Sequence, residues 1–128
     1  MQPQAQISLD DCSDLMDQAL ARIESNNQLL ALEALVSLMQ LVCGQVEDLG
    51  LLGASHDQIV FWNRLNSVWM QVLDSCQGMA WLESLDWAAL SEAVESSANI
   101  LELFGLVDYP LGFQETFILE KIHRLESQ

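Results

Sequence analysis

The sequence predicts an all-α fold, a compact bundle of about five amphipathic helices that forms a single domain over residues 1–128. Three observations carry this prediction. Apolar residues recur at helical spacing almost throughout, and no run alternates with the period of a β-strand. Prolines occur only at Pro3 and Pro110, outside the periodic segments. A hydrophobic content of 51% in 128 residues is enough to bury a core without disulfides or metals.

The first helix is expected from about Ser8 to Asn26, with Ser8 as its N-cap. Asp10 and Asp11 would then lie in the first turn, where the helix dipole favours negative charge. Residues 1–7 precede this helix and are expected to be flexible. One helical face is apolar and the opposite face is acidic. The apolar face consists of Cys12, Leu15, Met16, Ala19, Leu20 and Ile23, and the acidic face of Asp10, Asp14, Asp17 and Glu24.

The second helix is expected from its cap, Asn27, to about Gly50. Its polar wedge is narrow, and about two-thirds of its circumference is apolar. A helix of this kind is expected at the centre of the bundle, packed by several neighbours. The wedge consists of Glu33, Ser37, Gln40, Gly44 and Glu47.

The third helix is expected to open at Ser55 and to end near Cys76. Ser55 followed by Gln58 predicts a capping box at its start. Ile59 and Met70 fall outside its buried face and form a small apolar spot among polar residues. The buried face consists of Phe61, Trp62, Leu65, Val68, Trp69, Val72, Leu73 and Cys76.

The fourth helix is expected from about Asp86 to Phe104 and stops at Gly105. Three small residues on it indicate the close approach of a neighbouring helix; they are Ala89, Ala93 and Ser97. Its buried face is expected to contain Leu90, Ala93, Val94, Ser97, Leu101 and Phe104.

A fifth helix is expected from about Phe113 to Glu126. Lys121, His123 and Arg124 lie near its C-terminus, where the helix dipole favours cations. Its apolar face contains Phe117, Ile118, Ile122 and Leu125.

The charge of the chain is strongly one-sided, with 19 Asp and Glu against 4 Lys and Arg and a formal net charge of −15. Arg64 is the only Lys or Arg between Arg22 and Lys121. A field of one sign around a small domain selects partners by charge. We therefore expect a protein partner with a basic surface. Direct binding to nucleic acid or to a membrane is not expected, because affinity for phosphates rests on Lys and Arg contacts.

No catalytic, cofactor-binding or metal-ligating residue is assigned, and the protein is expected not to be an enzyme. Ser55, His56 and Asp57 are neighbours in sequence, but adjacent helical residues point apart and do not form a triad. Glu120 and His123 match one Glu-x-x-His motif, whereas a di-iron bundle requires two. This pair also lies opposite the apolar face of the last helix. A metal-binding helical-bundle enzyme or carrier is the least favoured alternative.

The cysteines indicate a reducing compartment. Cys12, Cys43 and Cys76 are odd in number, widely spaced and placed on or beside apolar faces, so buried reduced thiols are expected. The N-terminus lacks the basic and apolar regions of a signal peptide. The apolar stretch 29–46 is interrupted by polar residues and is expected to be a core helix. The sequence therefore predicts a cytoplasmic protein.

The expected function is that of a small acidic adaptor, chaperone or inhibitor. Carboxylate ridges would steer it to a basic protein surface, and an apolar or tryptophan spot would supply lasting contact. The alternative is a nucleic-acid mimic that inhibits a DNA- or RNA-binding enzyme, of the phage anti-restriction or anti-CRISPR type. The candidate partner-binding residues are Glu92, Glu95, Glu102, Asp14, Asp17, Glu24, Ile59, Met70 and Trp81.

Overall fold

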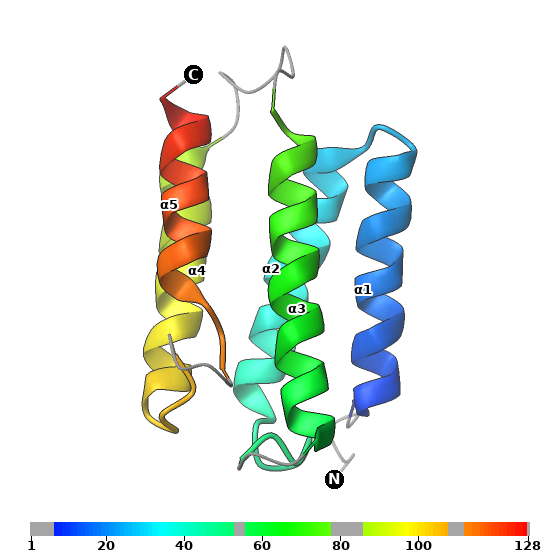
Figure 1. Ribbon diagram of the computed structural model, residues 1–128, viewed down its shortest axis with the longest axis vertical. Helices are drawn as coiled ribbons and strands as arrows, with labels where there is room; N and C mark the ends of the chain where they lie inside the picture. The colour runs from blue at the N-terminus through cyan, green and yellow to red at the C-terminus, as the bar shows by residue number, and fades with distance from the viewer. Residues whose placement is uncertain (1–6, 53–55, 78–85, 108–111, 128) are drawn as a thin grey trace, which may run out of the picture.

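The computed structural model describes residues 7–52, 56–77, 86–107 and 112–127, which form five α-helices (Figure 1). Within these ranges the single β-type contact is an isolated bridge between Val107 and Phe113. The predicted all-α bundle is confirmed. The helices are α1 (Leu9–Glu24), α2 (Gln28–Gly44), α3 (His56–Ser75), α4 (Trp87–Glu102) and α5 (Glu115–Glu126).

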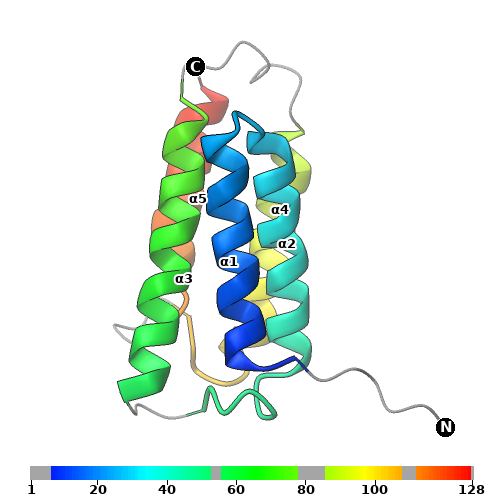
Figure 2. The ribbon, with the colours of Figure 1, turned by 90° about the vertical axis from the view of Figure 1, so that its right-hand side faces the viewer.

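Two helices share the centre of the bundle. α2 contacts α1, α3 and α4, as its wide apolar circumference predicts, and α3 contacts α1, α2 and α5. Figure 2 shows α1 lying over α2 and α3, with α4 and α5 behind them. α2 and α4 run in the same direction, opposite to α1, α3 and α5 (Figure 1). The contact between α2 and α4 therefore joins two parallel helices.

The start of α1 agrees with the sequence prediction. The N–H of Asp11 donates to Ser8 Oγ at 3.1 Å, and the N–H of Ser8 donates to the Asp11 carboxylate at 2.9 Å. This reciprocal pair is a capping box, which satisfies two otherwise unpaired donors. Ile7, expected within a flexible end, is half-buried and donates its N–H to Gln45 Oε1 at 3.1 Å. Residues 1–6 lie outside the described residues.

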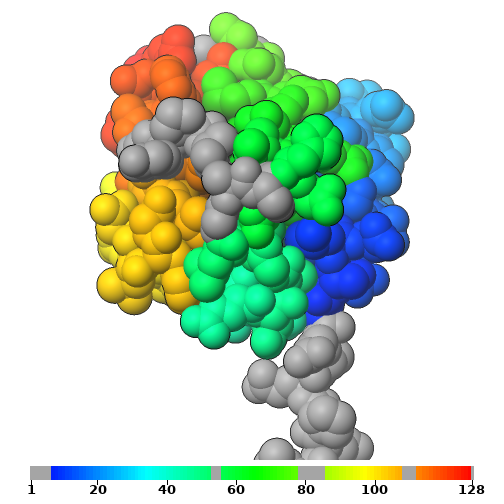
Figure 3. All heavy atoms as spheres, turned by 60° about the horizontal axis from the view of Figure 1, so that its bottom comes forward, coloured from blue at the N-terminus to red at the C-terminus, as the bar shows by residue number. Residues whose placement is uncertain are grey.

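The expected extension of α2 to Gly50 is wrong, because the helix ends at Gly44. Glycine is a poor helix former, which favours the end at this position. Asn27 occupies the N-cap position, but its side chain makes no capping hydrogen bond. Residues 45–50 turn across the end of the bundle between the start of α1 and the end of α4 (Figure 3). This turn and the residue that follows it close the core with three buried side chains, those of Val46, Leu49 and Leu51.

Asn66 fastens α3 to the chain that leads into α5. Its Nδ2 donates to the carbonyl of Gly112 at 2.9 Å, and its Oδ1 accepts from the N–H of Gln114 at 3.0 Å. The N–H of Phe113, whose side chain is fully buried, donates to the carbonyl of Leu106 at 2.8 Å. The fifth helix starts only after this segment, at Glu115 and not at Phe113 as expected.

The core contains most of the apolar residues that helical periodicity assigns to it, including Trp62 and Trp69, both fully buried. Two of the side chains assigned to the core are exposed. Phe104 is 36% exposed because α4 ends at Glu102, two residues before it. Phe117 is 60% exposed because α5 is a peripheral helix that turns a narrow face, centred on Ile118 and Ile122, to the core.

Candidate protein-binding surface

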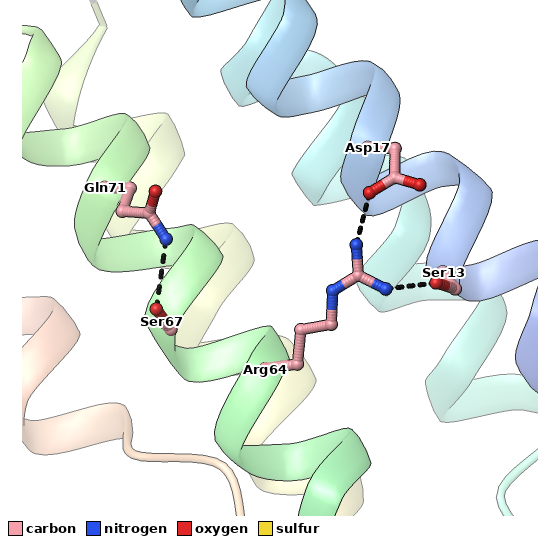
Figure 4. A network of polar contacts seen from close by, with 5 residues as sticks. All are labelled: Ser13, Asp17, Arg64, Ser67 and Gln71. Carbon is pink, nitrogen blue, oxygen red and sulfur yellow. Dashed lines mark hydrogen bonds and ion pairs between the residues drawn. The ribbon is translucent and has the colours of Figure 1, made fainter.

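The positive charge near the middle of the sequence is paired with a carboxylate of a neighbouring helix at the surface of the bundle. The guanidinium of Arg64 on α3 forms an ion pair with Asp17 and a hydrogen bond with Ser13, both on α1 (Figure 4). Lys121 on α5 forms an ion pair with Asp74 on α3. Lys121 therefore joins two helices, a role beyond the interaction with the helix dipole that the sequence predicts. The surface presents even less positive charge than the composition indicates.

The carboxylates expected to face a partner are on the surface. Glu92, Glu95 and Glu102 are all exposed on α4, and Asp14 and Glu24 are exposed on α1. Asp17 differs from them because its carboxylate is engaged by Arg64, although 62% of its side chain remains exposed. Its placement ties α1 to α3. A partner-binding role for these residues stays a prediction.

The predicted apolar spot on α3 is only partly accessible. Ile59 and Met70 are both half-buried, and Met70 packs against the core. The neighbouring Asn66 is engaged by the segment that leads into α5. Trp81, the third apolar candidate, lies outside the described residues. Trp87, which lies near it in sequence, is buried.

A groove lies on the described surface between α2 and α4. Two adjoining hollows of about 460 and 470 Å³ follow the contact between these helices and share Val36, Gln40, Ala89 and Ala93. The first hollow also contains Leu29 and Glu33, and the second also contains Glu92, Ser96 and Ile100. We call the surface made by Leu29, Glu33, Val36, Gln40, Ala89, Glu92, Ala93, Ser96 and Ile100 the α2–α4 groove.

The α2–α4 groove bears on the interpretation of two sequence features. Ala89 and Ala93 were expected to mark close helix approach, but Ala89 is exposed and Ala93 only half-buried. The close approach is made by Ser97, which is buried and whose carbonyl accepts from the thiol of Cys43 at 3.5 Å. α1, α3 and α4 pack against α2, as expected, but they leave part of its apolar circumference uncovered. Three leucines remain exposed; they are Leu29 at 47%, Leu30 at 41% and Leu41 at 38%.

A sequence signal for the groove existed. The second helix carries more leucines than its neighbours can cover, and the fourth carries small residues on an adjoining face. Neither feature alone distinguishes a buried helix contact from an open groove. A smaller hollow of about 370 Å³ lies between α1 and α3, with Arg64 on its wall. The α2–α4 groove contains no basic side chain.

The structure places the Glu-x-x-His motif on the surface, as the helical pattern predicts, with Glu120 and His123 both exposed. Across the described residues, no three His, Cys, Asp or Glu side chains lie close enough together to hold a metal ion. None of the helices described combines the length and the apolar content needed to cross a bilayer.

All three cysteines are buried free thiols, as expected. Burial, together with the nearby Asp11 carboxylate, raises the pKa of Cys12 from its usual 9.0 to about 11. Burial likewise raises the pKa of Cys76 to about 11, and it raises the pKa of Cys43. Thiols in this state are poor nucleophiles at neutral pH, since the thiolate is the reactive form.

These raised pKa values predict a loss of stability in alkali. Between pH 9 and about pH 11 the unfolded chain loses its thiol protons, whereas the folded protein retains those of Cys12 and Cys76. The free energy of unfolding should therefore fall as the pH rises, by up to about 1.4 kcal/mol per pH unit for each thiol. Urea denaturation at several pH values measures this slope.

The double variant Cys12→Ala/Cys76→Ala is the control for the alkaline slope. The chain has one lysine and one tyrosine, so few other groups titrate in this range. The variant should be less stable at pH 8 but should lose less stability between pH 9 and pH 11. An unchanged slope would show that other groups cause the alkaline unfolding.

Comparison of this chain with protein-family models, with curated proteins and with solved structures found no match. The described residues form an acidic bundle of five helices with an open groove between two parallel helices.

Proposed function

We propose that this protein is a non-enzymatic binding protein that acts by attaching to a basic surface of another protein. The observation that carries the proposal is the charge of the α2 and α4 faces. Apart from Glu33, Glu92, Glu95 and Glu102, these two helices contain no charged side chain, and all four carboxylates are exposed. Such a face attracts cationic partners and speeds their association.

The two ion pairs that join helices of the bundle support the same function. Arg64 and Lys121 are held by Asp17 and Asp74, so they are not available to attract anionic partners. The open groove beside the carboxylates supplies apolar contact area that a purely electrostatic encounter lacks. A partner steered by charge can therefore be retained by burial of apolar surface.

The nucleic-acid mimic is the second candidate, favoured by the exposure of Glu92, Glu95 and Glu102 along α4. A mimic would hold its partner almost entirely through charge. Its affinity should fall steeply with salt, and nucleic acid should compete with it. A partner retained through apolar contact should instead stay bound at high salt and should not be displaced by nucleic acid.

The test is affinity capture on the immobilised full-length protein from an extract of the source cell. Bound proteins are eluted in steps from about 0.1 M to about 1 M salt, over which the screening length falls from about 10 Å to about 3 Å, and are identified by mass spectrometry. One cognate basic protein, retained after unrelated cationic proteins have eluted, is the expected result. The proposal fails if every bound protein elutes at low salt as an unrelated cationic mixture.

A matched pair of charge variants locates the attraction. Glu92→Gln/Glu95→Gln/Glu102→Gln removes three carboxylates from α4, and Glu47→Gln/Asp48→Asn/Glu126→Gln removes three exposed carboxylates elsewhere. The α4 variant should slow association with the captured partner by roughly tenfold at low salt, and the control by less than about twofold. Equal slowing would mean that net charge alone attracts the partner. Competition by nucleic acid would favour the mimic.

A further inference from the structure

We propose that the α2–α4 groove is the docking site for a basic amphipathic helix of the partner protein. This inference rests on the proposed function and specifies the element of the partner that is bound. It is carried by the shape of the groove, by the side chains within it and by the charges along its edges.

The groove has the length of a short helix. On α2 it extends from Leu29 to Gln40 and on α4 from Ala89 to Ile100, in each case about 16 Å of helix axis. A partner helix of three to four turns would match this length. Its apolar residues at positions i, i+4, i+7 and i+11 would lie along one stripe facing the groove.

The side chains of the groove suit such a stripe. Ala89, Ala93 and Ser96 are small and leave space along α4, whereas Leu29 and Ile100 are large and stand 47% and 43% exposed at opposite ends. Leucine-sized side chains of the partner helix can enter the groove above the small residues and pack against the large ones. The apolar surface that the bundle leaves uncovered would then be buried.

A helical partner segment fits this groove better than an extended one. Both walls are helices, whose backbone hydrogen bonds are made within each helix, so they present no free edge to an added strand. An extended segment would bring unpaired backbone N–H and C=O groups against apolar side chains, which is costly. In a helix the backbone N–H and C=O groups hydrogen-bond to one another, so only side chains would contact the groove.

The charges around the groove indicate that the bound helix is basic. Glu33 stands on the α2 side and Glu92 on the α4 side, with no Lys or Arg on either helix. Lys and Arg flanking the apolar stripe of the partner would lie beside these carboxylates. A second copy of this chain is disfavoured as the occupant, since two molecules of net charge −15 repel each other.

The test uses a labelled synthetic helical peptide of about 16 residues, with Leu at i, i+4, i+7 and i+11 and with Lys and Arg elsewhere. Binding to the full-length protein is measured by fluorescence anisotropy at low and high salt. A scrambled peptide of the same composition removes the stripe but keeps the charge. The striped peptide should bind at least tenfold more tightly than the scrambled peptide and should retain this advantage in high salt.

Two pairs of adjacent residues provide matched variants. Ala89→Leu fills the groove, whereas Ala88→Leu places the same side chain on an exposed position of α4 outside it. Leu29→Gln removes an apolar wall, whereas Leu30→Gln changes an exposed leucine that is not part of the groove. Ala89→Leu and Leu29→Gln should each weaken binding at least tenfold, and their controls by less than twofold. Circular dichroism checks that all four variants fold.

The outcomes separate this inference from the proposed function. If both peptides bind equally well and all variants match the wild type, the groove is not the site, although attraction to basic partners stands. If neither peptide binds at low salt, both proposals fail. If the protein alone sediments as a dimer that Ala89→Leu dissociates, the occupant is a second copy and the inference of a partner helix is overturned.

Discussion

Trp69→Ala should lower the free energy of unfolding by about 3–5 kcal/mol, the largest change expected from any single substitution considered for this protein. Trp69 lies on the buried face of α3, one of the two central helices, and its side chain is fully buried. Its removal forfeits the transfer free energy of the indole and leaves a cavity that a close-packed interior fills incompletely. Such a loss is a large fraction of the total stability of a small domain.

Urea denaturation followed by far-ultraviolet circular dichroism measures this change without depending on tryptophan fluorescence. Phe117→Ala is the matched control, because it also removes an aromatic ring but at a position that is 60% exposed. The control should change the free energy of unfolding by no more than about 0.5 kcal/mol. Similar losses for both variants would contradict the arrangement of α3 and α5 described above.

Gly112→Ala should lower the free energy of unfolding by about 1–3 kcal/mol, although it adds a single methyl group. A Cβ atom at Gly112 would lie 2.5 Å from the carbonyl oxygen of Leu106 and 2.7 Å from its carbonyl carbon. These are backbone atoms that cannot rotate away. The two segments would have to separate, which would disturb the hydrogen bond from Phe113 to Leu106 and the contacts of Asn66 with Gly112 and Gln114.

Gly44→Ala is the control for the added methyl group. Gly44 lies in the last turn of α2, and no atom would lie within 4 Å of an added Cβ. This variant should be as stable as the wild type or more stable by about 0.5–1 kcal/mol, because alanine favours the helix. A loss of less than about 0.5 kcal/mol in Gly112→Ala would show that the segments at Leu106 and Gly112 do not approach as closely as described.

Much of the fold was predictable from local signals. The helices of the described residues, the cap at Ser8 and the start of α4 directly after Asp86 follow from periodicity and capping residues, which act over a few positions. The end of α2 was not predictable in this way. Residues 45–50 continue the apolar pattern of a helix, but the chain uses Val46, Leu49 and Leu51 to close the end of the core.

The candidate site was predictable in its charge and not in its shape. The carboxylates of α4 are exposed because the periodic pattern places them opposite Leu90, Val94 and Leu101. The engagement of Asp17 by Arg64 depends on contact between α1 and α3, which no local pattern encodes. The partial burial of Met70 likewise depends on the packing of distant parts of the chain.

The sequence by itself determined the approximate positions of the helices, most of the buried face of each and the scarcity of positive charge, because these properties depend on residue type and on short-range spacing. Only the tertiary structure decided which apolar residues stay uncovered and which charges are paired. The physical reason is that burial and ion pairing depend on which helices become neighbours. α2 meets α4 closely through Cys43 and Ser97, while Leu29 and Ile100 remain exposed beside the resulting groove.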